Sequence, residues 1–143
     1  MERTAEARWE GELRSGRGRI RLGSGAFEGE YSFGTRFESS PGTNPEELLG
    51  ASHAGCFTMA LANTLAKAGH PATRIDTRAV VRLEKVGEGF SVTGIQLVTR
   101  GVVPGVSSEE FQRAADDMGA NCIISRALKS VPIRVQATLE SGG

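Results

Sequence analysis

The sequence has no excess of charge of either sign, because 17 Lys and Arg residues balance 17 Asp and Glu residues in a chain of 143. Proteins that bind nucleic acid over a broad surface are usually basic, so this balance argues against a nucleic-acid partner. Hydrophobic residues make up 38% of the chain and charged residues 24%, which is typical of a folded protein. The length fits one ordinary domain, and we expect a single domain over residues 1–143.

Long apolar runs are also missing. No stretch approaches the roughly 18 consecutive apolar residues that a membrane-spanning helix needs. The first ten residues are polar and hold no apolar segment of the kind found in secretory signals. We therefore expect a cytoplasmic protein with no membrane partner.

Cysteine is scarce, with Cys56 and Cys122 alone in the chain. Cytoplasmic cysteine pairs tend to be catalytic or redox-sensing rather than structural. A second interpretation is that both are inert thiols that pack as small hydrophobic side chains. A third is a metal site of His53, Cys56 and Cys122, because His53 and Cys56 are three residues apart on one helix face. The sequence has no C-x-x-C motif that would support the metal site.

Alternating apolar and polar residues predict most of the strands. Gly16 and Gly18 mark a turn after the first of them. In residues 90–100 the alternation slips at Gly94, which predicts a β-bulge there. The predicted strands cover residues 5–13, the segment around Ile20 and Leu22, residues 27–37, a hairpin of residues 75–86 and 90–100, and residues 131–139.

A long helix is predicted from Pro45 to about Ala68. Asn44 can cap it, Glu47 holds the capping-box position, and Gly69 follows its end. Its many small side chains indicate a central helix buried on several faces.

Two shorter helices are predicted after the hairpin. Ser107 and Glu110 have capping-box spacing at the start of one helix, which Gly119 is expected to break. Asn121 can cap a second helix over residues 122–129. Strands and helices are segregated along the chain, which favours an α+β fold.

The two cysteines differ in their local settings. Cys56 falls inside the long helix, where the helix dipole is weak and apolar neighbours disfavour the thiolate. A reactive Cys56 would therefore need a nearby cation. Cys122 is predicted as the first residue of a short helix, where a thiolate is favoured. Local physics alone selects Cys122 as the nucleophile.

Several motifs resemble the OsmC/Ohr family (osmotically inducible protein and organic hydroperoxide resistance protein). The matching motifs are T-R-F-E at residues 35–38, G-T-N-P-E-E-L-L-G-A-S-H-A-G-C-F-T-M-A-L at 42–61, V-P-G-V at 103–106 and C-x-x-S-x-A-L-K at 122–129. W-E-G near the start and T-R-F-E favour the OsmC branch. The resemblance implies an OsmC-like fold with antiparallel sheets around a long central helix, assembled as an intertwined homodimer.

The resemblance also implies a thiol peroxidase that reduces organic hydroperoxides, and hydrogen peroxide less well, to alcohol and water. Cys56 matches the peroxidatic cysteine, which becomes a sulfenic acid, and Cys122 matches the resolving cysteine, which forms a disulfide with it. An external thiol or dithiol then reduces that disulfide. No metal, haem or flavin is expected. The alternative is a redox-sensing or small-molecule-binding protein that uses the same cysteine pair as a switch.

Arg36 matches the arginine that stabilises the thiolate and orients the peroxide, and Glu46 matches the glutamate that holds it. Arg17 is the alternative arginine. A guanidinium suits this role because it offers a fixed fork of donors. The side chains expected at the substrate are Phe37, Phe57, Met59 and His53.

Two features of the sequence do not fit a direct assignment of the family's roles to these residues. Glu46 precedes Cys56 by ten positions, about 15 Å along a straight helix. Either the helix breaks at Gly50 or Gly55, or a second chain supplies the glutamate. Ile123 stands where the family usually has proline after the resolving cysteine.

Overall fold

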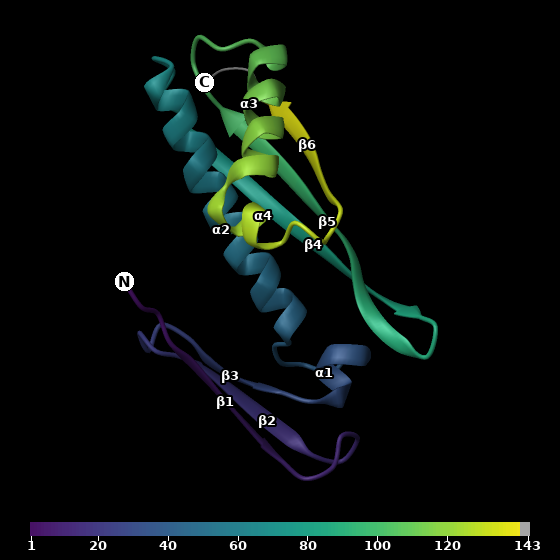
Figure 1. The fold of residues 1–143 in the computed structure, drawn as a ribbon. Helices are drawn as coiled ribbons and strands as arrows, with labels where there is room; N and C mark the ends of the chain where they lie inside the picture. The colour runs from purple at the N-terminus through teal and green to yellow at the C-terminus, as the bar shows by residue number, and fades with distance from the viewer. Residues whose placement is uncertain (141–143) are drawn as a thin grey trace. The chain divides into compact units, whose positions relative to one another are not determined.

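The computed structural model describes residues 1–140, and within them the chain forms six strands and four helices (Figure 1). Contacts within the chain gather into two units, Met1–Leu48 and Leu49–Gly143, which are described separately. In chain order the elements are β1 (Ala5–Glu10), β2 (Arg17–Leu22), β3 (Glu28–Tyr31), α1 (Phe33–Phe37), α2 (Pro45–Lys67), β4 (Arg74–Val86), β5 (Gly89–Val102), α3 (Ser108–Asn121), α4 (Ile123–Ala127) and β6 (Ile133–Leu139).

The first unit contains an antiparallel sheet in the order β1-β2-β3. Gly18 was predicted in a turn but lies within β2, in register with Trp9 on one side and Tyr31 on the other. The Trp9 and Tyr31 rings pack 5.5 Å apart, and a Cβ at Gly18 would collide with both. The glycine is therefore needed for side-chain packing across the sheet.

The strand predicted over residues 27–37 is wrong in its second half, because β3 ends at Tyr31 and helix α1 follows. Ser32 caps α1: its hydroxyl accepts the backbone N–H of Thr35, and the Thr35 hydroxyl accepts the backbone N–H of Ser32. This reciprocal capping box stabilises a helical turn. Over five residues, the alternation of Phe33, Thr35 and Phe37 looks the same in a strand as in a short helix.

Helix α2 begins as predicted, with the Asn44 side chain accepting the backbone N–H of Glu47 at 2.7 Å. It ends at Lys67, before Gly69 turns the chain with a φ of +91°. Within a single chain, the expectation that α2 is buried on several faces is not met. The buried positions share one face, namely Glu46, Gly50, His53, Phe57, Leu61 and Leu65.

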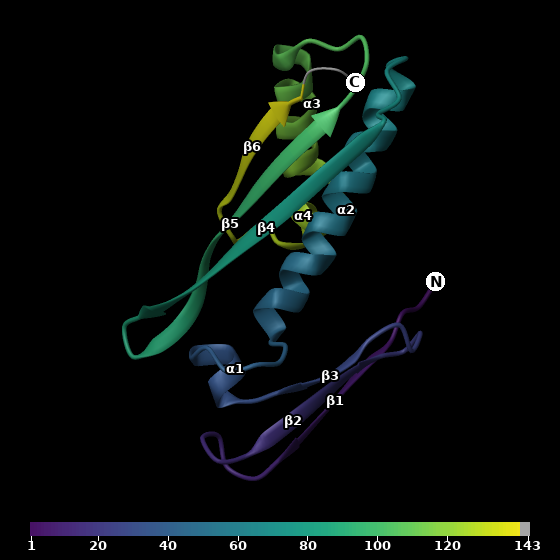
Figure 2. The same cartoon turned by 180° about the vertical axis from the view of Figure 1, so that it is seen from behind.

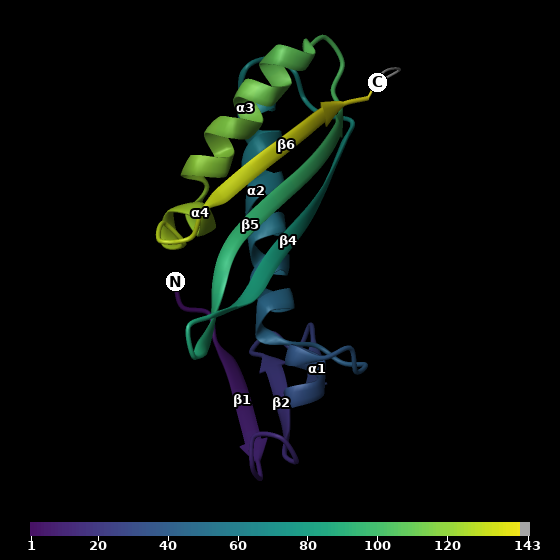
Figure 3. The ribbon, with the colours of Figure 1, turned by 90° about the vertical axis from the view of Figure 1, so that its right-hand side faces the viewer.

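The second unit holds the sheet β4-β5-β6, with α2 and α3 on one of its faces (Figures 1 and 2). The predicted hairpin of β4 and β5 is confirmed, and its register shifts between Arg82 and Leu83, opposite the expected bulge at Gly94. β6 pairs parallel to β5, so this sheet is mixed rather than antiparallel. Figure 3 shows α3 and α4 leading back to the start of β6, the kind of crossover that a parallel pair requires.

The two short helices of this unit differ from their predicted bounds. The Ser107–Glu110 capping box is confirmed, but Gly119 does not end α3. Gly119 is buried within the helix, and a Cβ at this position would collide with Val135 of β6, so the close packing of α3 on β6 requires a glycine. Cys122, and not Asn121, is the N-cap of α4, which ends at Ala127.

The core of the second unit lies between its sheet and helices. It is formed by Phe57, Leu61, Leu65, Ile95, Leu97, Val103, Phe111, Ala115 and Cys122. Among residues 1–140, no helix is long and apolar enough to cross a membrane.

Candidate active site

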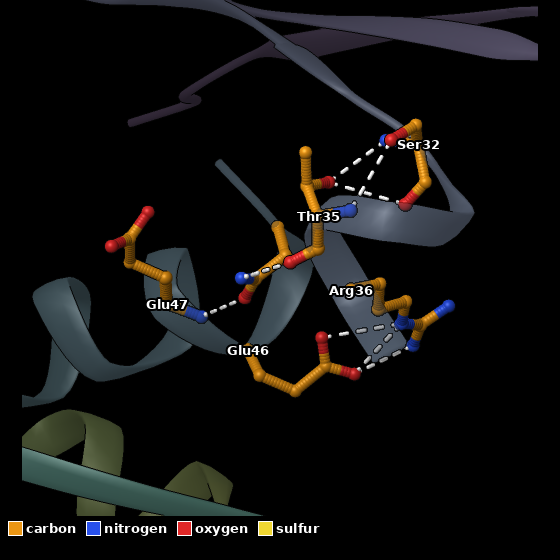
Figure 4. A network of polar contacts seen from close by, with 6 residues as sticks. Ser32, Thr35, Arg36, Glu46 and Glu47 are labelled. Carbon is orange, nitrogen blue, oxygen red and sulfur yellow. Dashed lines mark hydrogen bonds and ion pairs between the residues drawn. The ribbon is translucent and has the colours of Figure 1, made fainter. Parts of the chain in front are cut away.

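Arg36 and Glu46 form a bidentate ion pair within the first unit (Figure 4). The Arg36 Nη2 group donates to Glu46 Oε1 at 2.7 Å, and the Nε group donates to Oε2 at 3.2 Å and to Oε1 at 2.9 Å. Figure 4 shows the third guanidinium nitrogen pointing away from the carboxylate. The Glu46 side chain is 11% exposed and the Arg36 side chain 40%, so the pair has a buried anion and an accessible cation. Two parallel bonds fix the direction of the guanidinium plane.

Local hydrogen bonds hold the two elements that carry this pair. Arg36 lies on α1, whose start is fixed by the Ser32–Thr35 capping box. The Asn44 side chain donates to the carbonyl oxygen of Thr35 at 3.0 Å and caps α2, whose first turn carries Glu46. An anion in the first turn of a long helix is also favoured by the helix dipole.

The other candidate residues of the first unit lie in two places. Phe37 is half-buried, 5.1 Å from the Phe33 ring, and its own ring is 5.4 Å from the Arg36 guanidinium carbon. Arg17, the alternative arginine, is exposed on β2 opposite Glu10. Phe37 is therefore brought to Arg36 by α1, which carries both.

In the second unit, the sulfurs of the two cysteines both contact the first turn of α4. Cys56 is half-buried on α2, and its Sγ accepts the backbone N–H of Ile124 at 3.5 Å. Cys122 is only 4% exposed; its Sγ accepts the backbone N–H of Ser125 at 3.5 Å and donates to the Ser125 hydroxyl at 3.1 Å. Sulfurs from residues 66 positions apart in sequence thus bind neighbouring residues of one turn.

The burial of the two cysteines opposes the order of reactivity that local physics suggested. Cys122 has the N-terminal position expected to favour a thiolate, but it is enclosed. Cys56 lies mid-helix, but it is more accessible and receives a backbone N–H. A thiol that meets a dissolved substrate first must be reachable, and this requirement favours Cys56.

His53 is fully buried one turn before Cys56 on α2. Its Nε2 lies 2.8 Å from the Ser125 hydroxyl, and its Nδ1 has no hydrogen-bond partner among residues 1–140. Burial lowers the pKa of His53, so the ring is neutral near pH 7. Sequence reasoning expected His53 at the substrate and missed Ser125, although the C-x-x-S spacing of residues 122–125 matches a cap and its N3 partner.

Phe57 and Met59, which were also expected to contact the substrate, differ in their exposure. Phe57 is fully buried in the core of the second unit. Met59 is 76% exposed and lines a shallow hollow with Thr58 of α2 and Ile75 of β4. The structure therefore does not bring these two side chains together.

The metal-site alternative draws no support from the geometry. Within the described part of the chain, no three His, Cys, Asp or Glu side chains are grouped so that they could hold a metal ion. The His53 Nε2 is directed to Ser125 instead.

Comparison with known proteins identifies relatives over almost the whole chain. The family model described as OsmC-like protein matches residues 37–136, a span that includes Glu46 and both cysteines. Peroxiredoxin OsmC from Escherichia coli (strain K12) is 43% identical over 131 residues, covering 91% of this chain and 92% of that protein. Peroxiredoxin OsmC from Shigella flexneri matches to the same extent.

Solved structures share the fold at lower sequence identity. The organic hydroperoxide resistance protein OhrB of Bacillus subtilis superposes with a TM-score of 0.73 at 23% identity, covering 96% of this chain and 98% of that one. An OsmC-like protein of unknown function from Vibrio cholerae gives a TM-score of 0.76 at 19% identity, with coverages of 96% and 99%. These matches confirm the expected α+β, OsmC-like fold, and the peroxiredoxin relatives confirm the expected enzyme class, a thiol peroxidase. The chain belongs to the OsmC-like protein family.

Proposed function

We propose that this enzyme reduces organic hydroperoxides, and hydrogen peroxide less well, through a Cys56 sulfenic acid and a Cys56–Cys122 disulfide. The observation that carries the proposal is the contrast between the two sulfurs at the first turn of α4. Cys56 is accessible enough to meet a substrate, whereas Cys122 is enclosed beside it and suited to a reaction within the protein. An external thiol or dithiol completes the cycle.

The chemistry has three steps. The Cys56 thiolate attacks one oxygen of the hydroperoxide; an S–O bond forms, the O–O bond breaks, and the alkoxide leaves as an alcohol after taking a proton. The sulfur of Cys122 then attacks Cys56 Sγ, so that an S–S bond forms, the S–O bond breaks and water is released. Two thiol groups of the reductant finally exchange with the disulfide and restore both cysteines.

In this proposal Arg36 stabilises the Cys56 thiolate and orients the peroxide, while Glu46 holds the guanidinium. Support comes from the pair itself, which uses Nε and Nη2 and directs the third nitrogen away from Glu46. A fixed fork with a spare donor can bind a thiolate and a peroxide oxygen. Phe37, beside Arg36, would then contribute an apolar surface for an organic substrate.

We further propose that residues 1–143 act as one domain and that two chains form an intertwined cytoplasmic homodimer. Helix α2 runs from Pro45 to Lys67 through both glycines at which a break was considered. The other explanation for the distance between Glu46 and Cys56 is that a second chain supplies the Arg36–Glu46 pair to Cys56. The exposed face of α2, which carries Gly55 and Met59, is a surface that such a partner could cover.

The test is turnover of cumene hydroperoxide by the purified protein with dithiothreitol as reductant. We expect each chain to consume many equivalents, and tert-butyl hydroperoxide to be reduced faster than hydrogen peroxide. Consumption of a single equivalent would contradict the peroxidase cycle and favour the redox-sensing alternative. A faster reaction with hydrogen peroxide would contradict the proposed substrate class.

A further inference from the structure

Three buried polar side chains form a continuous chain of hydrogen bonds in the second unit. His53 Nε2 lies 2.8 Å from the Ser125 hydroxyl, which lies 3.1 Å from Cys122 Sγ. The exposed fractions of His53, Ser125 and Cys122 are 0%, 2% and 4%. An imidazole on α2 is thus linked to the enclosed sulfur through one hydroxyl on α4.

This arrangement is costly if its role is only to fill space. The Nδ1 atom of His53 is buried with no hydrogen-bond partner in residues 1–140, and an unpaired polar atom in the interior is destabilising. The positions nearby on the same face of α2 are Phe57 and Leu61, which pack in the core without such a cost. The hydrogen bond that the imidazole does form is to Ser125, so a role for the ring is to be sought at that hydroxyl.

We propose that His53 is a positioning residue for the disulfide-forming step: it orients the Ser125 hydroxyl toward Cys122 and so stabilises the Cys122 thiolate that attacks the Cys56 sulfenic acid. The inference rests on the proposed function, because it assigns a role within that cycle. The role proposed here for His53 is therefore not contact with the substrate, as the sequence predicted, but positioning of Ser125 beside the buried Cys122.

The direction of the hydrogen bonds follows from the donors available. A neutral imidazole carries one N–H, and with that proton on Nε2 the ring donates to the Ser125 oxygen. The Ser125 hydroxyl proton is then free to point at Cys122 Sγ, where it joins the Ser125 backbone N–H at 3.5 Å. Two donors from one residue thus converge on the sulfur. When Cys122 is a thiol, the S–H donates to the same hydroxyl oxygen instead.

The step balances without a further reactant. The Cys122 thiolate attacks Cys56 Sγ, an S–S bond forms and the S–O bond of the sulfenic acid breaks. The proton that Cys122 has lost ends on the departing oxygen, which leaves as water. His53 keeps its charge state throughout, in agreement with the lowering of its pKa by burial.

The experiment separates the two steps in a single turnover with one equivalent of cumene hydroperoxide and no reductant. Loss of the Cys56 thiol reports peroxide attack, and disulfide formation is followed by rapid acid quench and mass spectrometry. We expect Ser125→Ala and His53→Leu to slow disulfide formation about tenfold, the cost of one hydrogen bond to a charged group. His53→Gln should stay close to the wild-type rate, because a neutral amide also donates to Ser125.

A second readout responds to the same step. A slowly resolved sulfenic acid persists and is oxidised further, so Ser125→Ala and His53→Leu should accumulate Cys56 sulfinic acid at lower peroxide concentrations than wild type. The matched control is Thr99→Val, which removes another fully buried hydroxyl of this unit from a network with Thr77 and no cysteine. Thr99→Val should show neither effect.

The outcomes separate a failure of the positioning role of His53 from a failure of the proposed peroxidase cycle. If Ser125→Ala, which leaves a smaller side chain in place, resolves at the wild-type rate, the positioning role is wrong while the peroxidase cycle stands. If His53→Gln is as slow as His53→Leu, an imidazole is needed for more than orientation, and the positioning role is again wrong. If the wild-type chain forms no Cys56–Cys122 disulfide, the proposed function itself fails.

Discussion

The Arg36–Glu46 pair of the first unit and the His53–Ser125–Cys122 network of the second differ in charge and in burial. The pair is ionic, with an Arg36 side chain 40% exposed, whereas the network is enclosed and held by hydrogen bonds through a neutral imidazole. A charge near water costs little to maintain, and it suits a step that begins with an anion attacking a dissolved substrate. An enclosed network whose hydrogen bonds reach the Cys122 sulfur suits a step confined to two protein sulfurs.

The largest effect is expected at Cys56. In the proposed cycle Cys56→Ser removes the nucleophile, so turnover of cumene hydroperoxide should fall by at least about 1,000-fold, to the background of the assay. The measurement is hydroperoxide consumption with dithiothreitol. Full activity in Cys56→Ser combined with loss in Cys122→Ser would show that the N-terminal position of Cys122 outweighs its burial.

Arg36→Ala should slow peroxide attack on Cys56 by about 10- to 100-fold, the loss of one or two charge-assisted hydrogen bonds. The measurement is the second-order rate of Cys56 oxidation by stopped flow. Glu46→Gln should have a smaller effect, because the guanidinium remains but is less firmly held.

The matched control for Arg36 is Arg19→Ala. Arg19 forms an exposed ion pair with Glu28 at 2.9 Å in the same unit, so its loss removes the same charge from another place. The rate of Cys56 oxidation in Arg19→Ala should equal that of wild type. An unchanged rate in Arg36→Ala would contradict the role of Arg36 and move the hypothesis to Arg17.

Two helix caps allow a comparison at equal energetic cost. Ser32→Ala and Ser107→Ala each remove a capping box, a loss of about 1 kcal/mol of helix stability. Only Ser32 caps the helix that carries Arg36, so Ser32→Ala should lower kcat/KM several-fold while Ser107→Ala leaves it unchanged. Urea unfolding and peroxidase kinetics on both variants provide the measurement. Equal kinetic losses would mean that α1 does not position Arg36.

The smallest effect concerns pH. Burial lowers the pKa of His53 below its ordinary value of 6.5, so the unfolded chain binds a proton more readily than the folded one. The free energy of unfolding should therefore be highest above pH 6.5 and fall as the pH drops below it. His53→Gln should lose part of this pH dependence in urea unfolding at pH 7.5 and pH 5.5. An identical pH dependence in wild type and His53→Gln would show that His53 is protonated equally in both states.

Signals that act over a few residues predicted their elements well. Asn44 and Ser107 cap helices where expected, because a cap depends on the next three residues. The slip at Gly94 predicted the bulge in β5 because alternation is also local. Helix α1 was missed for the opposite reason, since five residues are too few for the two periodicities to differ.

Features that depend on distant contacts could not be predicted from the residues alone. The parallel pairing of β6 depends on where α3 and α4 return the chain. Gly119 was read as a helix breaker, but its role is set by Val135 of a neighbouring strand. The contact of His53 with Ser125 joins residues 72 positions apart, so no local pattern marks it.

The candidate site was predicted through motifs rather than through local physics. The T-N-P-E and T-R-F-E motifs drew attention to Glu46 and Arg36, which the structure joins in an ion pair. Local physics favoured Cys122 over Cys56, because the helix-terminus rule takes no account of burial. Only the folded chain shows that the better-placed thiol is also the less accessible one.

The most direct test of the central claim is the location of the first sulfenic acid. Cys122→Ser and Cys56→Ser are each treated with one equivalent of cumene hydroperoxide in the presence of dimedone, which traps sulfenic acids, and the adduct is located by peptide mass spectrometry. We predict rapid labelling of Cys56 in Cys122→Ser and little labelling of Cys122 in Cys56→Ser. Rapid labelling of Cys122 in Cys56→Ser, with none of Cys56 in Cys122→Ser, would contradict the assignment of Cys56 as the attacking thiol.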